Sequence, residues 1–270
     1  MVKKEIKKNW ALVTGGSSGI GMELAKLLAK DGYSLIIVAK PQEELDRAKA
    51  WFDENMPKTK IVYHQQDLAT QDAAQKLYDF TTQQKYEIDI FCNNAGYGSF
   101  GWFHELPIER VKNMLNLIVM TVWELTRLYL KDMVAKDKGR ILITSSSGGL
   151  MPVPKSAAYS GGKAFSYFYG LAIYQELKEM GSKVTVTVLL PPPTRTGFAK
   201  AAGMEKTKTF EGAMAKDPDY VAAAAYKALM KGKRKVIPGA VARIMMKTFS
   251  HTARTTRQVI LMKIGEMGSK

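Results

Sequence analysis

The sequence predicts an α/β fold: a doubly wound parallel sheet with helices on both faces, followed by a C-terminal helical extension. Two observations indicate this class. Short runs rich in Val, Ile and Leu alternate with longer amphipathic stretches, and a glycine-rich turn follows the first run. Such apolar runs are typical of strands buried on both faces, and helices between them form right-handed crossovers.

The order of the elements follows from the same alternation. Strands are predicted at Trp10–Val13, Leu35–Ala39, Ile61–Tyr63, Ile88–Phe91, Arg140–Ile143 and Val184–Leu190. The helical patterns between them include Met22–Lys30, Glu43–Phe52, Ala73–Gln83, Ile108–Val134 and Ala157–Met180. Because no Gly/Ser-rich linker, low-complexity tract or internal repeat interrupts the pattern, we predict one domain over residues 1–239 and an extension over residues 240–270.

The composition fits this class and excludes others. The 270-residue chain is 46% hydrophobic and 24% charged, close to globular averages, so wholesale disorder is excluded. Its one cysteine, Cys92, excludes an internal disulfide and leaves a Cys-based zinc site without partners. The first residues carry charge without an apolar core, and no apolar run approaches the about 18 residues that span a bilayer. We therefore expect a soluble, cytoplasmic protein without a metal site.

Positive charge is concentrated near the carboxyl end of the chain. The sequence holds 40 Lys and Arg residues against 25 Asp and Glu residues, which gives a formal net charge of +15. Residues 195–270 contain 16 of these basic and 5 of these acidic side chains. Such an excess attracts anionic partners such as nucleic acid, acidic lipid or phosphorylated small molecules, or it serves solubility alone.

The predicted extension has two different faces when it forms a helix. The apolar face holds Val241, Ile244, Met245, Thr248 and Phe249. The basic face holds Arg243, Lys247, Arg254 and Arg257. This pattern fits peripheral contact with a membrane surface. It fits equally well a helix whose apolar side packs on its own domain or on a partner subunit.

The first chemical signal is the glycine turn between the first strand and the first helix. Gly15 permits a tight turn, Gly19 lets a pyrophosphate approach the backbone, and Gly21 allows close packing of helix and strand. Phosphates would meet the free N–H groups at the start of the helix. A glycine pattern alone also fits a plain tight turn, but its place after the first strand favours a dinucleotide site.

The end of the second strand bears on the choice of dinucleotide. A site for NAD usually places Asp or Glu there to accept from the ribose 2′-hydroxyl. Here the strand ends in Ala39 and Lys40. A lysine can pair with a 2′-phosphate, so we predict NADP(H) as the cofactor. The alternative is that Lys40 is a solvated loop lysine.

A second set of residues carries acid–base chemistry. Tyr159 and Lys163 lie four positions apart in a helical pattern and therefore on one face of that helix. A phenol titrates near pH ~10, and a neighbouring ammonium is expected to lower that pKa. The strand before this helix delivers Ser146 to the same sheet edge as the glycine turn, where its hydroxyl would hydrogen-bond the oxygen that Tyr159 protonates.

These motifs, together with Asn93-Asn-Ala-Gly96 and Asn116, resemble those of the short-chain dehydrogenase/reductase family over roughly residues 8–196. The resemblance implies a Rossmann fold with about seven parallel strands and hydride transfer at the nicotinamide C4 atom. It implies that Tyr159 is the acid and base and that Ser146 anchors the carbonyl. Lys163 would bind the nicotinamide ribose, and Asn116 would hold a water of the proton relay.

The resemblance also implies how the cofactor is held. Asp67 would meet the adenine amino group, and Asn94 would line the cofactor groove. The Ala39–Lys40 ending resembles that of NADP-preferring members, although Ser18 stands where many of them carry a basic residue. The candidate cofactor-binding residues are Gly15, Ser17, Ser18, Gly19, Ile20, Lys40, Asp67, Leu68, Asn94, Tyr159, Lys163, Thr194 and Thr196.

One stretch departs from the family pattern. After the sixth strand, members usually carry Pro-Gly and then a threonine that touches the nicotinamide carboxamide, but this chain has Pro192 in place of the glycine. Proline fixes φ near about −65° and has no N–H. Either the loop follows a polyproline-like path or the carboxamide contacts shift, and Thr194 and Thr196 stay candidate contacts.

Aromatic and Met side chains suggest the substrate. They follow the Asn-Asn-Ala-Gly turn and the last threonine, at Tyr97, Phe100, Trp102, Phe103, Phe198, Met204, Phe210 and Met214. They would wall an apolar pocket, or some of them are core or surface residues. The predicted reaction interconverts a carbonyl and a secondary alcohol on an apolar substrate, such as a lipid-like or acyl-chain ketone.

Two other functional classes stay open beside this enzyme. The first is a non-catalytic NADP(H)-binding scaffold or redox sensor, for which Pro192 is the support. The second is a nucleic-acid-binding protein, which charge alone suggests, and we expect no nucleic acid as a partner. The resemblance further implies a homodimer or homotetramer that pairs through the long helices after Arg110 and around Tyr159.

Overall fold

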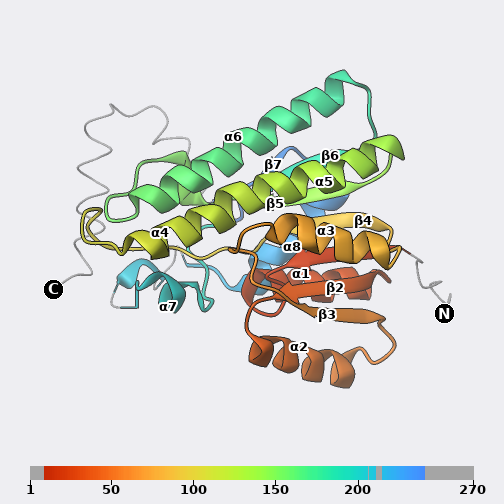
Figure 1. Ribbon diagram of the computed structural model, residues 1–270, viewed down its shortest axis with the longest axis horizontal. Coiled ribbons are helices and arrows are strands. Elements are labelled where there is room, and N and C mark those ends of the chain that lie inside the picture. Colours follow the sequence, from red (N-terminus) through yellow and green to blue (C-terminus); the bar gives the residue numbers. More distant parts are fainter. Residues whose placement is uncertain (1–8, 206, 211–214, 241–270) are drawn as a thin grey trace.

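The computed structural model describes residues 9–205, 207–210 and 215–240. The predicted fold class is confirmed: seven parallel strands form one sheet with helices on both faces (Figure 1). The predicted extension lies outside the described residues except for Ala240, so its amphipathic helix stays a prediction. None of the described helices is both long and apolar enough to span a bilayer.

The strands follow one another in the sheet in the order β3-β2-β1-β4-β5-β6-β7. Their bounds are β1 Trp10–Thr14, β2 Ser34–Ala39, β3 Ile61–Gln65, β4 Ile88–Asn93, β5 Arg140–Thr144, β6 Thr185–Leu189 and β7 Lys235–Val236. Every pair is parallel. The chain winds outward from β1 in one direction and then returns to β4 on its other side, so a crevice forms between their carboxyl ends.

Helices cover both faces of this sheet. On one face lie α1 Gly19–Lys30, α2 Gln42–Asn55 and α8 Pro218–Met230, and on the other lie α3 Ala73–Gln83, α4 Ile108–Leu115, α5 Val122–Ala135 and α6 Ala157–Glu179. In Figure 1, α5 and α6 are the long pair at the top and α2 lies at the bottom. The short elements are η2 Ser147–Leu150, α7 Phe198–Ala202 and η3 Lys208–Phe210.

The central strands β1 and β2 are almost entirely apolar, and every one of their residues is buried. In β1, Ala11 and Val13 pack toward α1 and α8, whereas Leu12 packs toward α3 and α5. All three are fully buried. The continuous apolar runs of the sequence therefore have the origin that was predicted for them.

The helical pattern Ile108–Val134 forms as predicted but contains an irregularity that the periodicity did not indicate. Between α4 and α5 the helix widens into a π-helical segment, η1, at Asn116–Thr121. Both ends of this segment are tied to the loop after β3: the Asn116 amide donates to the Ala69 carbonyl at 2.6 Å, and the Thr121 hydroxyl donates to the Leu68 carbonyl at 2.7 Å. Such segments occur often at functional sites.

A pair of glycines in α6 tests how closely this helix packs on the sheet. A Cβ added at Gly170 would lie 2.5 Å from Val188 Cγ2, so we expect Gly170→Ala to lower the free energy of unfolding by about 1–3 kcal/mol. Gly161→Ala is the matched control, because no described atom lies within 4 Å of its added Cβ. It should raise stability by up to about 1 kcal/mol through helix propensity. Urea denaturation of both variants measures the difference, and equal effects would contradict the packing.

Candidate active site

A cavity of about 2000 Å³ opens at the carboxyl ends of the strands. A single drug-sized ligand fills roughly 300–1,000 Å³, so this space accommodates a dinucleotide and a second molecule. All fifteen candidate catalytic and cofactor-binding residues lie in its lining. The structure thus brings together residues that the sequence spreads from position 15 to position 196.

The glycine turn forms the floor at one end of the cavity. Gly15 and Gly19 have φ values of +61° and +53°, a region that residues with a Cβ rarely adopt. A Cβ at Gly21 would lie 2.0 Å from the Gly15 carbonyl oxygen, so α1 can approach the turn only with glycine there. The N-cap residue Ser18 makes no side-chain hydrogen bond to the first turn of α1. The first amides of α1 therefore have no hydroxyl cap.

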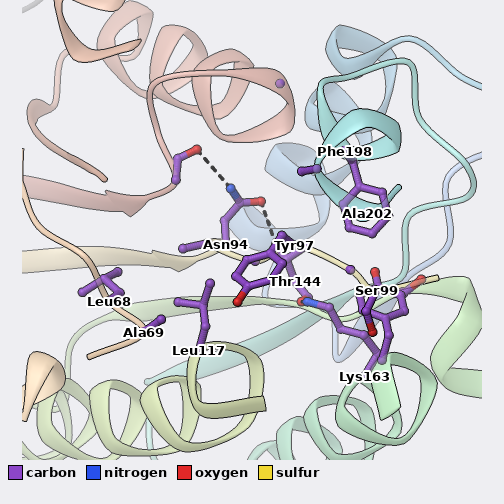
Figure 2. A pocket seen from close by; sticks show the side chains of 18 of the residues that line it. Leu68, Ala69, Asn94, Tyr97, Ser99, Leu117, Thr144, Lys163, Phe198 and Ala202 are labelled. Atoms are coloured by element: carbon purple, nitrogen blue, oxygen red, sulfur yellow. Dashed lines mark hydrogen bonds between the residues drawn. The ribbon is translucent and has the colours of Figure 1, made fainter. Parts of the chain in front are cut away.

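Asn94 joins the ends of three strands beneath the cavity. Its amide nitrogen donates to the carbonyl oxygens of Thr14 and Gly15 at 3.1 and 3.3 Å. Its amide oxygen accepts from the Thr144 hydroxyl at 3.1 Å (Figure 2). Asn94 lines the cofactor groove as predicted, and it also fixes the turn after β1 to the ends of β4 and β5.

Ser146 and Tyr159 form the reactive pair. Ser146 follows β5, and its hydroxyl accepts from the Gly148 N–H at 3.0 Å, which orients it. Burial raises the pKa of Tyr159 to about 12, and a hydrogen bond with Ser146 opposes part of this rise. The phenol is therefore protonated at neutral pH and able to donate its proton.

Lys163 lies beside this pair but points past the phenol. Its ammonium donates to the Thr144 carbonyl at 2.8 Å, and its Nζ atom lies 5.9 Å from the centroid of the Tyr159 ring. Burial lowers the pKa of Lys163 to about 8. The expectation that Lys163 lowers the pKa of Tyr159 is wrong for this structure, because burial dominates and the pKa of the phenol rises.

Asn116 lies at the start of η1 and lines the cavity. Its amide nitrogen is engaged by the Ala69 carbonyl, so the side chain anchors the loop after β3 to the long helix. The water-holding role that the family resemblance implies for this residue stays a prediction.

Two predicted cofactor contacts, Lys40 and Asp67, bind each other. The Lys40 ammonium lies 2.7 Å from the Oδ2 atom of Asp67, and the other carboxylate oxygen of Asp67, Oδ1, accepts from the Ala69 N–H at 3.0 Å. The hydrogen bond to Asp67 raises the pKa of Lys40. Partial burial opposes ionisation of Asp67, but the bonds from Lys40 and Ala69 outweigh it, and the pKa of Asp67 is lowered. A 2′-phosphate would have to compete with this ion pair for Lys40.

Glu44 is a cavity residue that the sequence analysis missed. It lies in the first turn of α2, and one carboxylate oxygen accepts from the hydroxyls of Ser17 and Ser18 at 2.7 and 3.1 Å. The signal in the sequence was a pair of acidic residues, Glu43 and Glu44, just after Lys40. Such a pair usually complements a helix N-terminus, so nothing in the pattern pointed to the cavity.

The apolar wall is partly as predicted. Tyr97, Phe100, Phe198, Met204 and Phe210 line the cavity, and the Phe198 ring centroid lies 5.4 Å from that of Tyr159. Figure 2 shows Phe198 and Ala202 across the cavity from Lys163.

Two aromatic residues of the predicted wall are surface residues. Trp102 and Phe103 are 53% and 70% exposed, so the expectation that they wall the pocket is wrong. Gly101, whose N–H donates to the Lys155 carbonyl, precedes them, and the Lys155 ammonium lies over the Trp102 ring. These contacts hold the loop on the outside of the domain. Met214 lies outside the described residues.

The three consecutive prolines are accommodated without distortion of the site. Their carbonyls accept from the Ser147 N–H, the Thr194 hydroxyl and the Lys216 N–H, so the stretch needs no N–H of its own. The Thr196 Cγ2 atom lies 3.0 Å from a Cβ added at Gly19, which places Thr196 over the glycine turn.

The residues present fit a dinucleotide. The glycine turn leaves backbone N–H groups for phosphates, and an added Cβ at Gly19 or Gly21 would meet atoms of the site itself. The opposite part of the cavity carries a proton donor and an apolar wall. This arrangement can position a carbonyl between Tyr159 and a cofactor that lies along the strand ends.

Comparison with known proteins identifies a matching family and similar sequences. The family model of short chain dehydrogenases matches residues 9–207. A protein of Mus musculus named very-long-chain 3-oxoacyl-CoA reductase is 34% identical over 197 residues, which cover 71% of this chain and 61% of the relative. The chain thus matches less than two thirds of the length of that relative.

Solved structures share the architecture. A short-chain dehydrogenase from Sphingobium yanoikuyae in complex with NADPH is 25% identical, with a TM-score of 0.78 over 90% of this chain and 93% of that chain. A short-chain dehydrogenase/reductase from Burkholderia phymatum in complex with NAD is 20% identical, with a TM-score of 0.79 over 90% and 93%. The second likeness concerns the fold alone.

The lowered pKa of Lys163 predicts a pH dependence of cofactor binding. Above pH 8 the free protein loses the Lys163 proton, so binding an anionic dinucleotide must take a proton up. We expect the Kd for NADPH to be flat just below that pH and to rise by up to about tenfold per pH unit above it. Fluorescence titration measures Kd, and Lys163→Met should bind more weakly with no inflection. A flat profile for the unmodified protein would contradict the assignment.

Proposed function

Because this chain belongs to the short-chain dehydrogenase family, we propose that it is an NADP(H)-dependent oxidoreductase that interconverts a carbonyl and a secondary alcohol on an apolar, acyl-chain substrate. The observation that carries the proposal is the half-buried, protonated Tyr159, hydrogen-bonded to Ser146 and faced by Phe198 in the strand-end cavity. Because its pKa is raised, the phenol carries its proton at neutral pH, and proton donation is the direction of carbonyl reduction.

Each side chain of the site has its own role in this reaction. When bound, the nicotinamide supplies or accepts the hydride. Tyr159 gives its proton to the carbonyl oxygen during reduction, and Ser146 donates a hydrogen bond to the same oxygen. Lys163 holds a positive charge below the site and fixes the end of β5 through the Thr144 carbonyl. The wall formed by Phe198 and Phe210 excludes water from the reacting atoms.

The cofactor would be held along the strand ends. The backbone of the glycine turn, from Gly15 to Ile20, would bind the pyrophosphate. Asp67 and Leu68 would contact the adenine, and Lys40 would pair with the 2′-phosphate. Thr194 and Thr196 would meet the carboxamide at the other end. The NADPH complex of the Sphingobium yanoikuyae protein supports a phosphorylated dinucleotide.

We propose a 3-oxoacyl thioester as the substrate class. The name of the Mus musculus relative supports an acyl-CoA, and the apolar wall suits its chain. Such a substrate has a second carbonyl group, whose carbon lies two bonds from the reacting carbon. Two buried hydroxyls that line the cavity, those of Ser99 and Ser160, have no hydrogen-bond partner among the described residues. A buried hydroxyl without a partner is costly, so rotation of either side chain toward the cavity would let its hydroxyl bond a polar atom of the substrate.

We also propose that the protein forms a homodimer or homotetramer. Four large apolar side chains on η1, α5 and α6 are exposed on the described chain: Met120, Trp123, Phe165 and Phe168. They lie on the long helices through which a homodimer or homotetramer would pair. Burial of such a patch in an interface would remove its contact with water.

The proton donor is tested by Tyr159→Phe. We expect this variant to bind NADPH with an affinity close to that of the unmodified protein but to lose about 10²–10⁴-fold in carbonyl reduction, because the ring remains and the proton is gone. Tyr169→Phe is the matched control on the same helix: its hydroxyl donates to the Trp123 carbonyl, away from the cavity lining, and turnover should change less than twofold. Retained turnover in Tyr159→Phe would refute the assigned acid.

The substrate class is tested by a graded series of 3-oxoacyl thioesters. We expect kcat/KM to rise about fourfold for each CH₂ that becomes buried, because burial of a CH₂ contributes about 0.8 kcal/mol. Phe198→Ala should flatten this series, whereas Phe103→Ala, which removes a side chain that is 70% exposed and outside the described cavity lining, should leave it unchanged. Faster turnover of small polar ketones or sugars would overturn the substrate class.

A further inference from the structure

The adenosine end of the cavity has an unusual charge balance. Lys40 is the only basic residue among the described residues that line the cavity from the glycine turn, the β2–α2 connection and the β3–α3 connection. Three carboxylates lie in the same lining, those of Glu44, Asp67 and Asp72. Asp67 already pairs with Lys40 at 2.7 Å. Within these three segments and the first turn of α2, carboxylates therefore outnumber the one ammonium.

Glu44 lies close to the position of a 2′-substituent. In folds of this kind a residue at the end of β2 contacts the ribose 2′ position, and here Lys40 directly follows the last residue of β2, Ala39. Glu44 lies one helical turn after Lys40 and reaches back across the cavity edge to Ser18 of the glycine turn. The Glu44 carboxylate thus lies between the glycine turn and the connection after β2, the two segments that would contact the 2′ group.

The hydrogen bonds of Glu44 withdraw two donors from a phosphate. A serine hydroxyl has one O–H to donate. The hydroxyls of Ser17 and Ser18 both donate to the same oxygen of Glu44, at 2.7 and 3.1 Å. Neither hydroxyl is then available to a 2′-phosphate, while the carboxylate itself repels that dianion. A ribose 2′-hydroxyl meets no such repulsion and can donate to a carboxylate.

We propose that Glu44 determines cofactor specificity by opposing the 2′-phosphate, so that it narrows the preference of this protein for NADP(H) over NAD(H). The proposal rests on the proposed function, in which a nicotinamide dinucleotide occupies the cavity. Lys40 favours the phosphorylated cofactor and Glu44 disfavours it, and the balance of the two sets the ratio of affinities.

The test compares the Kd values of NADPH and NADH, measured by fluorescence titration at one fixed ionic strength. Glu44→Gln keeps the shape and a hydrogen-bond acceptor but removes the charge, so NADPH should bind about tenfold more tightly. NADH binding should change less than twofold. Glu44→Ala is a second variant with the same expected direction, and thermal unfolding checks that both variants fold.

Glu43→Gln is the matched control. It removes the same charge from the same helical turn, but Glu43 is exposed and outside the described cavity lining. Its ratio of NADPH to NADH affinity should stay within twofold of that of the unmodified protein. Lys40→Ala should move the ratio the other way, about tenfold toward NADH.

The possible results separate the two proposals. Equal changes in NADPH and NADH affinity on Glu44→Gln, or the same shift in Glu43→Gln, would overturn the role of Glu44. A shift in the ratio confined to Glu44 variants would support it. Failure of the unmodified protein to bind either dinucleotide would instead refute the proposed function.

Discussion

The site depends on the parallel arrangement of β1, β4 and β5, whose carboxyl ends meet at one edge of the sheet. Asn94 holds that edge together, because its one amide group bonds to the turn after β1 and to Thr144 at the end of β5. Lys163 adds a second bond to Thr144 from α6. The glycine turn and the acid–base pair belong to distant parts of the chain, and these bonds set the distance between them.

Burial has opposite effects on the two titratable groups of the reactive site. It raises the pKa of Tyr159 and lowers the pKa of Lys163, because in both cases the low dielectric disfavours the charged form. The phenol of Tyr159 therefore keeps its proton, whereas the ammonium of Lys163 loses its proton at a lower pH than that of an ordinary lysine. An anionic ligand would reverse the second effect by stabilising the ammonium, which couples cofactor binding to the protonation of Lys163.

The sequence predicted what depends on local pattern. Most residues of β1, β2, β4, β5 and β6 are buried, so these strands could be predicted from their apolar runs. The spacing of Tyr159 and Lys163 required only that a helix form. The widening of the helix at η1 could not be predicted from the sequence. It is accompanied by hydrogen bonds from the Asn116 and Thr121 side chains to a loop about fifty residues earlier in the chain. The outward path of Trp102 and Phe103 was missed for a similar reason, since the contacts with Lys155 that hold this loop are also distant in sequence.

By itself, the sequence determined the fold class, the glycine turn and the set of residues that meet at the strand ends. The fold class and the glycine turn follow from periodicity and from the rule that parallel strands share a carboxyl edge, whereas most of the other site residues were predicted from the resemblance of the sequence to a known family. The tertiary structure decided the protonation of Tyr159, the pairing of Lys40 with Asp67 and the capture of Ser17 and Ser18 by Glu44. Burial and charge pairing arise between segments that only the folded chain brings together, so no local pattern in the sequence records them.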